Sequence, residues 1–160
     1  RFARRDEPRL APVDLGELAR ATLDALRPRL EAAGIAAFLE APPGVVARAD
    51  RDKLREVLVN LLENARDALA TSPAPRRVTV VVRNGDGDAT LSVTDNGPGV
   101  PADALPRLFE PFFSTKPTGT GLGLAIARHA VEAHGGAIFA GPAEGAGLTV
   151  RVTLPLADAP

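Results

Sequence analysis

The chain has 160 residues, a formal net charge of −1, and 45% hydrophobic and 24% charged residues. This length predicts one domain with a real core, and the near-neutral charge argues against nucleic-acid binding, which calls for a clustered basic excess. No apolar run approaches the roughly 20 residues that cross a bilayer, and no signal peptide opens the chain, so no membrane contact by this chain is expected.

The first predicted helix begins after Asp14. Residues 1–12 are charged and punctuated by proline, which predicts the end of a preceding element followed by a linker. Methionine is absent, even at position 1, so we expect a piece of a longer protein. Asp14 and Glu17 have the spacing of a capping box, and an apolar helical period then carries the helix to about Gly34.

Two short strands and a second helix follow. Residues 35–40 (IAAFLE) and 45–49 (VVARA) predict strands on either side of a turn at Pro42-Pro43-Gly44. The second helix is predicted to begin at Asp50 and to end near Leu69.

The second half of the chain predicts a hairpin, two more helices and two final strands. Residues 77–84 and 89–95 alternate like paired strands around the turn NGDGD. The remaining expected elements are a short helix at 102–109, a helix that ends at His134 with Gly135-Gly136 as its C-cap, and strands at 137–142 and 147–155. This order predicts a mostly antiparallel sheet covered on one face by helices.

The second helix carries a polar strip beside its apolar face. At about 100° per residue, Asn60, Asn64 and Asp67 share that strip, while Glu56 and Glu63 point further round and are predicted to be exposed. Amide and carboxylate oxygens are ligands that suit Mg²⁺. Taken alone, the same strip is also typical of a solvated polar flank.

Two further stretches have the chemistry of a purine-nucleotide site. Asp95 ends a strand and can accept a hydrogen bond from an exocyclic amine, while Gly97 and Gly99 allow a base to approach the backbone. A plain Asp-Asn-Gly turn is the alternative. The segment 119–123 (GTGLG) leads into a helix, where bare backbone N–H groups bind anions, and Lys116 can add a charge. Neither a P-loop nor a dinucleotide fingerprint occurs there.

Four motifs in order resemble those of the sensor histidine kinases. They are NLLENARDAL (the N box), DNGPGV (the G1 box), LFEPFFSTK (the F box) and GTGLGLAI (the G2 box), and the resemblance covers about residues 13–156. It implies the Bergerat ATP-binding fold, a two-layer α/β sandwich with a mixed, mostly antiparallel sheet of about five strands covered on one face by three helices. The short lid is most similar to that of the nitrogen-regulation branch.

The resemblance also implies roles for individual residues. Asn64 becomes the Mg²⁺ ligand, Asp95 the adenine reader, and Thr149 a support for the hydrogen bonds of Asp95. The implied residues of the ATP site are Asn60, Asn64, Asp67, Asp95, Gly97, Gly99, Val100, Lys116, Gly119, Thr120, Gly121, Leu122, Gly123, Leu124 and Thr149. Many kinases carry a basic residue and an aromatic where this chain has Asp67 and Ala68, so stacking of adenine on that aromatic is not implied here. Phe109, Phe112 and Phe113 are compatible with packing the lid or with lining the pocket, and packing of the lid is favoured.

Three functions are compatible with these motifs: a histidine kinase catalytic domain, an ATP hydrolase or motor of the same fold, and a non-catalytic nucleotide-binding module. Related hydrolases resemble one another in carrying a glutamate base where this chain has Asn60, and an amide cannot take a proton at neutral pH. The four boxes are intact, which argues against a degenerate module. We therefore predict a protein-histidine kinase fragment that uses ATP and Mg²⁺.

The resemblance also predicts partners and a domain division. Residues 1–12 resemble the end of the second dimerisation helix with its linker, and residues 13–160 the catalytic domain. The phospho-acceptor would lie on a dimerisation domain outside this chain, because His129 and His134 are expected to be structural or surface residues, and a response regulator would act downstream. The absence of cysteine fits a reducing, cytoplasmic location, whether or not the parent protein is anchored in a membrane.

Overall fold

The computed structural model describes residues 7–113 and 122–157. A five-stranded sheet is formed by β2 (Ile35–Glu40), β4 (Arg76–Asn84), β5 (Asp88–Asp95), β7 (Leu148–Pro155) and β6 (Ala137–Pro142), in that order. The β2–β4 pair is parallel and the other three pairs are antiparallel. The prediction of a mixed, mostly antiparallel sheet is confirmed.

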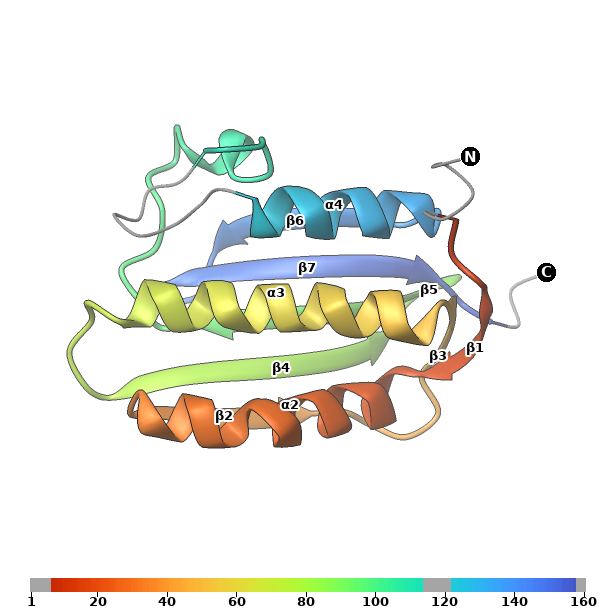
Figure 1. The fold of residues 1–160 in the computed structure, drawn as a ribbon, viewed down its shortest axis with the longest axis horizontal. Coiled ribbons are helices and arrows are strands. Elements are labelled where there is room, and N and C mark those ends of the chain that lie inside the picture. Colours follow the sequence, from red (N-terminus) through yellow and green to blue (C-terminus); the bar gives the residue numbers. More distant parts are fainter. Residues whose placement is uncertain (1–6, 114–121, 158–160) are drawn as a thin grey trace.

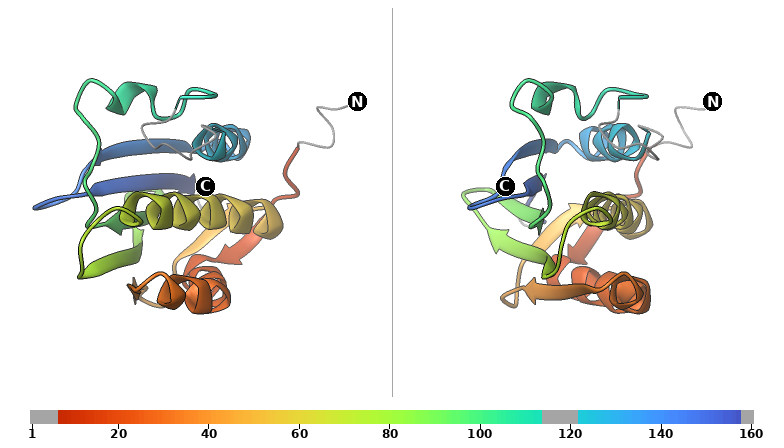
Figure 2. Two further views of the ribbon diagram at one scale, coloured as in Figure 1. Left: turned by 60° about the vertical axis from the view of Figure 1, so that its left-hand side comes forward. Right: turned by 90° about the vertical axis from the view of Figure 1, so that its left-hand side faces the viewer.

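Three helices form a single layer on one face of this sheet (Figures 1 and 2). They are α2 (Leu15–Ala32), α3 (Arg51–Leu69) and α4 (Gly123–Ala133). The core lies between the two layers, because alternate residues of β5 and β7 face the helices and are buried. Helix α3 contributes a full buried stripe, including Leu54, Leu58 and Leu61. The two-layer sandwich is confirmed. Among the described residues, no helix is both long and apolar enough to cross a bilayer.

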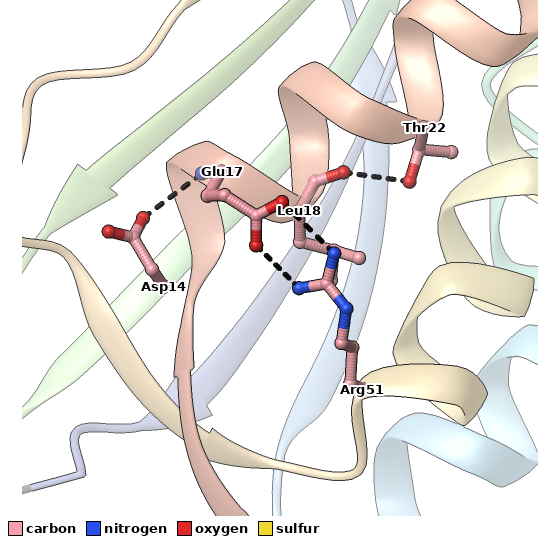
Figure 3. Close-up of polar contacts among 5 residues, drawn as sticks. All are labelled: Asp14, Glu17, Leu18, Thr22 and Arg51. Atoms are coloured by element: carbon pink, nitrogen blue, oxygen red, sulfur yellow. Dashed lines mark hydrogen bonds and ion pairs between the residues drawn. The ribbon is translucent and has the colours of Figure 1, made fainter.

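The predicted N-cap of α2 at Asp14 is present, but only this half of the capping box forms. The Asp14 carboxylate accepts a hydrogen bond from the Glu17 backbone N–H at 3.0 Å (Figure 3). The side chain of Glu17 is turned to α3, where the Arg51 guanidinium donates to both of its oxygens at 2.7 and 3.0 Å. Glu17 therefore ties α2 to α3 in addition to lying in the first turn of its own helix.

A two-stranded sheet that was not predicted closes one end of the molecule. Strand β1 (Ala11–Asp14) pairs antiparallel with β3 (Val46–Ala49). Leu156 forms an isolated antiparallel β-bridge with Ala47 of β3. β1 begins at Ala11, inside the segment expected to be linker. A four-residue strand containing a proline carries too short a pattern to be read from sequence, because its hydrogen bonds depend on a partner more than 30 residues away.

The prediction of a helix at residues 102–109 is wrong. Only a 3₁₀ turn, η1 (Leu105–Arg107), forms there. Most of the surrounding hydrogen bonds join residues three apart, as in Ala104 N–H to Pro101 O and Glu110 N–H to Arg107 O. Pro106 has no N–H to donate and its ring disfavours a continuous α-helix, so the segment remains a series of tight turns.

The buried side of α4 does not include all of its apolar residues. Ile126 is 54% exposed and Ala133 is exposed, although both are apolar. The buried stripe consists of Leu124, Ala127, Val131 and His134. These positions follow the helical period of about 3.6 residues, and the histidine takes a core position that the sequence pattern did not assign to it.

Candidate nucleotide site

The carboxylate of Asp95 faces the helix layer from the end of β5. Inward positions along this strand hold Ala89, Leu91 and Val93, and Asp95 takes the fourth such position with only 4% of its surface exposed. One carboxylate oxygen accepts a hydrogen bond from the Gly97 backbone N–H at 2.8 Å. A buried carboxylate must be satisfied by donors, so this is a position suited to reading a hydrogen-bond donor on a ligand.

Three glycines let the backbone close around Asp95. A Cβ on Gly97 would lie 3.0 Å from the Asp95 carboxylate and 3.4 Å from the Ala68 carbonyl oxygen at the end of α3. Gly99 has φ +76° and would place a Cβ 3.2 Å from the Gly147 carbonyl oxygen. Gly147 has φ +109°, and its Cβ would collide with the Asp95 carbonyl oxygen. Gly97 and Gly99 were predicted, whereas Gly147 was missed; its only signal is the Gly-Ala-Gly run before the last strand.

Asn96 fixes the loop that carries these glycines. Its side-chain oxygen accepts from the Arg77 N–H at 2.7 Å, and its amide group donates to the Pro75 carbonyl oxygen at 2.9 Å. Both partners lie at the start of β4, so the turn after Asp95 is held to the neighbouring strand. Asn96 thus orients the turn from outside the site.

Helices α3 and α4 lie side by side and run in opposite directions (Figure 1). The end of α4 meets the start of α3, where the Asp50 N–H donates to His134. The eleven residues of α4 span about 16 Å, and the same length measured along α3 from Asp50 ends near Leu61. The first turn of α4 therefore lies opposite the segment of α3 that contains Asn60 and Asn64.

The polar strip of α3 is partly buried. Asn60 and Asn64 are both half-buried, while Asp67 in the last turn is exposed. Glu56 is exposed as predicted, but Glu63 is not: it is half-buried and lies 2.8 Å from Arg29 of α2 and 3.0 Å from Arg66. The prediction for Glu63 was wrong because α2 packs along that side of α3 and brings a cation to it.

The first turn of α4 offers backbone donors without a side-chain cap. The N-cap residue, Leu122, makes no side-chain capping hydrogen bond, and the helix starts at Gly123. Gly123 has no positive φ and a Cβ there would meet no atom within 4 Å, so neither strain nor packing calls for glycine. Leu124 is buried, so its side chain belongs to the core. Such an N-terminus fits the phosphates of a nucleotide.

The other predicted site residues are Thr149, Val100 and four residues that the structure does not describe. Thr149 forms a hydrogen bond of 2.9 Å with Thr94, its partner in register, on the sheet face opposite to Asp95, so it does not support the carboxylate directly. Val100 is half-buried against the core. Lys116, Gly119, Thr120 and Gly121 lie outside the described residues.

The described residues contain no group of three or more histidine, cysteine, aspartate or glutamate side chains that could hold a metal ion. Mg²⁺ does not need such a group, because it keeps several waters and is bound through one or two protein oxygens plus substrate phosphates. The half-buried amide of Asn64, opposite the first turn of α4, fits that mode of binding.

Comparison with known proteins agrees with this geometry. Residues 49–158 match the family model described as histidine kinase-, DNA gyrase B- and HSP90-like ATPase. The chain is 34% identical to the mycobacterial sensor histidine kinase MprB, with a TM-score of 0.80 over 92% of this chain and 97% of that one. This chain belongs to the histidine kinase-, gyrase- and HSP90-like ATPase family.

Within that ATPase family, the similarity extends to complete sensor proteins. The chain is 42% identical over 117 residues, 73% of its length, to the sensor protein FixL of Bradyrhizobium diazoefficiens, but covers only 23% of that protein. It is 35% identical to ShkA, whose full-length structure in complex with AMPPNP gives a TM-score of 0.82 over 94% of this chain and 32% of ShkA. The chain thus spans about a quarter to a third of these relatives.

The F-box phenylalanines of this family member divide into two groups. Phe109 and Phe113 pack against the core, and the Arg107 guanidinium lies 4.6 Å from the centre of the Phe113 ring. Phe112 is 77% exposed and has φ +67°. Phe112 is therefore not packed against the core. The expectation that the three side chains pack the lid stays a prediction, because residues 114–121 lie outside the described residues.

Proposed function

We propose that this chain is the ATP-binding catalytic domain of a two-component sensor histidine kinase, and that it donates the γ-phosphoryl group of ATP to a histidine on a dimerisation domain outside the chain. The inward-facing, 4% exposed carboxylate of Asp95, enclosed by Gly97 and Gly147, carries this proposal. It is supported by membership of the ATPase family and by the order of the four motifs.

Each part of the site has a distinct task in this proposal. Asp95 accepts a hydrogen bond from the exocyclic amine of adenine, and the amides at the start of α4 donate to the phosphates. Asn60 and Asn64 lie opposite those amides and offer oxygens to the cation. Bound Mg²⁺ supplies positive charge that neutralises the phosphates.

Asn60 and Asn64, which lie opposite the first turn of α4, offer amide groups and not a general base for water. In the kinase reaction the acceptor imidazole nitrogen forms the new N–P bond, the bond to the β-phosphate oxygen breaks, and ADP leaves. Asn60 occupies the position at which a hydrolase needs a general base, and an amide does not serve as one. Transfer to an imidazole is therefore favoured over hydrolysis, the alternative on this fold.

We also propose that residues 1–12 contain the end of a dimerisation helix and a linker, that the full protein passes its phosphoryl group to a response regulator, and that this domain is cytoplasmic. The resemblance to sensor histidine kinases supports these partners. Arg9 and β1 already contact the catalytic domain, so the domain's packing begins before residue 13.

Calorimetry with a non-hydrolysable ATP analogue tests the proposed function. The chain should bind the analogue more tightly with Mg²⁺ than without it, and Asn64→Ala should lose that gain while its melting temperature stays near that of the wild type, because Asn64 lies off the buried stripe of α3. Failure of the wild-type chain to bind would refute the function. A collapse of the melting temperature in Asn64→Ala would instead make this residue structural.

A further inference from the structure

His134 is a buried polar residue at the end of α4, far along the helix from the proposed phosphate site. It is 5% exposed and occupies the C-cap position. Its Nδ1 lies 2.7 Å from the Ala130 carbonyl oxygen, and its Nε2 lies 3.0 Å from the Asp50 backbone nitrogen. A carbonyl only accepts, so Nδ1 must donate, and Nε2 accepts from the Asp50 N–H. The contacts therefore select one neutral tautomer.

Asp50 is itself the N-cap of α3. Its carboxylate accepts from the Lys53 N–H at 3.2 Å, while its own N–H is directed to His134. This hydrogen bond thus joins the C-cap of α4 to the N-cap of α3. Replacement of His134 by an apolar residue would leave a backbone donor without its protein acceptor.

The buried stripe of α4 before His134 makes apolar contacts, which do not fix the direction of the helix. Leu124, Ala127 and Val131 form the buried stripe, and the opposite side of the helix carries exposed residues such as Ile126 and His129. Apolar packing is non-directional, whereas the hydrogen bond to His134 has a defined geometry. A shift at this end moves the other end of a rigid helix, where the amides of the first turn lie.

We propose that His134 is a positioning residue for nucleotide binding: through its hydrogen bond to Asp50, it holds α4 against α3 so that the amides at the start of α4 stay opposite Asn60 and Asn64. This inference deepens the proposed function and rests on it. His134 does not touch the ligand. It affects nucleotide binding by fixing the orientation of α4.

Three variants distinguish a positioning role of His134 from a general effect on the stability of the fold. His134→Leu removes the acceptor and keeps an apolar side chain in the stripe, while His134→Gln retains an amide oxygen that can accept from the Asp50 N–H. Thr22→Val is the matched control, since it deletes another buried hydrogen bond, from Thr22 to the Leu18 carbonyl oxygen at 2.7 Å (Figure 3), on α2. All are compared at a temperature where circular dichroism shows each of them folded.

The first measurement is the affinity for the ATP analogue with Mg²⁺. His134→Leu should weaken binding roughly fivefold or more, whereas His134→Gln and Thr22→Val should remain within about twofold of the wild type. Equal affinities of His134→Leu and the wild type would overturn the inference. Equal losses in His134→Leu and Thr22→Val, or in the leucine and glutamine variants, would overturn it as well, because stability or ring shape would then explain the effect.

The second measurement needs no nucleotide, so it separates this inference from the proposed function. The chain has no cysteine, and Glu56→Cys with Ile126→Cys therefore allows spin labels on α3 and α4 alone; both positions are exposed. The distance distribution between the labels should shift or broaden in His134→Leu and not in Thr22→Val. An unchanged distribution would refute positioning by His134, even if the wild-type chain binds ATP as proposed.

Discussion

At the scale of single residues, the chemistry of the proposed site depends on one buried carboxylate. If Asp95 accepts from the adenine amine, a guanine base would present a carbonyl oxygen there, and two acceptors would face each other. An unsatisfied buried partner costs about 1–3 kcal/mol. We therefore expect ADP to bind about tenfold more tightly than GDP, and Asp95→Asn to reduce this preference.

Competitive calorimetry with the two diphosphates measures this preference. Asp24→Asn, at an exposed position on α2, is the control and should leave the ratio unchanged. Equal affinities of the wild-type chain for ADP and GDP would show that Asp95 does not read the base.

A second prediction at the scale of single residues concerns Gly147. Alanine at this position must adopt a φ of +109° and would place its Cβ against the carbonyl oxygen of Asp95. Gly147→Ala should lower the free energy of unfolding by about 2 kcal/mol or more. Gly141→Ala, where a Cβ meets nothing within 4 Å, should cost little. Urea unfolding of both variants distinguishes a special backbone position from a general intolerance of alanine.

At the scale of elements, ion pairs and caps join the three helices into one layer. Glu17–Arg51 lies at the start of α2 and α3, and Arg29–Glu63 joins the same helices further along. The four side chains remain between 30% and 57% exposed, and ion pairs in contact with solvent contribute little individually. The buried hydrogen bonds and the apolar stripes therefore decide the packing, and the ion pairs favour the observed register.

The N-cap of α3 predicts a dependence of stability on pH. Burial works against the charge of Asp50, but hydrogen bonds from the N–H groups of Arg9, Lys53 and Asp52, with the charge of Lys53, outweigh it and hold the pKa of Asp50 below its ordinary value of 3.8. The charged cap thus stabilises the fold above about pH 4 and loses this effect as the pH falls through the folded-state pKa.

Asp50→Asn should therefore melt below the wild type at pH 7, and the difference should shrink in acid below about pH 4. Asp103→Asn, at an exposed position, serves as the control. A difference in melting temperature between wild type and Asp50→Asn that stays constant from pH 7 to pH 3 would contradict a stabilising charge at this cap.

Sequence periodicity predicted the elements whose burial is decided within one helix or strand. The apolar stripe of α3 and the alternation of β5 were both correct. Asp95 was singled out because its carboxylate ends a strand, and its role as the adenine reader stays a prediction. The failures have a common physical cause. Each missed feature depends on a partner that is distant in the chain. β1 forms by pairing with β3, His134 is held by a hydrogen bond from Asp50, and Gly147 is required because its backbone lies against that of Asp95.

At the scale of the whole molecule, the two ends of α4 have different roles. The amides at its start face the proposed phosphate site, while its last turn is bound to α3 through His134. His134 uses both ring nitrogens within the fold, and His129 is exposed on the same helix. Neither of the two histidines in the chain is therefore placed to receive a phosphoryl group from a nucleotide at the start of the helix.

This arrangement predicts that the chain binds ATP but does not phosphorylate itself. His134 lies about 15 Å along the helix from the amides, whereas phosphoryl transfer requires the acceptor within roughly 3–3.5 Å. Incubation with radiolabelled ATP and Mg²⁺ should leave the isolated chain unlabelled. Addition of a dimerisation domain that carries an acceptor histidine should place the label on that domain, and replacement of the histidine there by alanine should abolish it. Acid-labile label on this chain alone would place the acceptor within it and contradict the assignment of a separate phospho-acceptor domain.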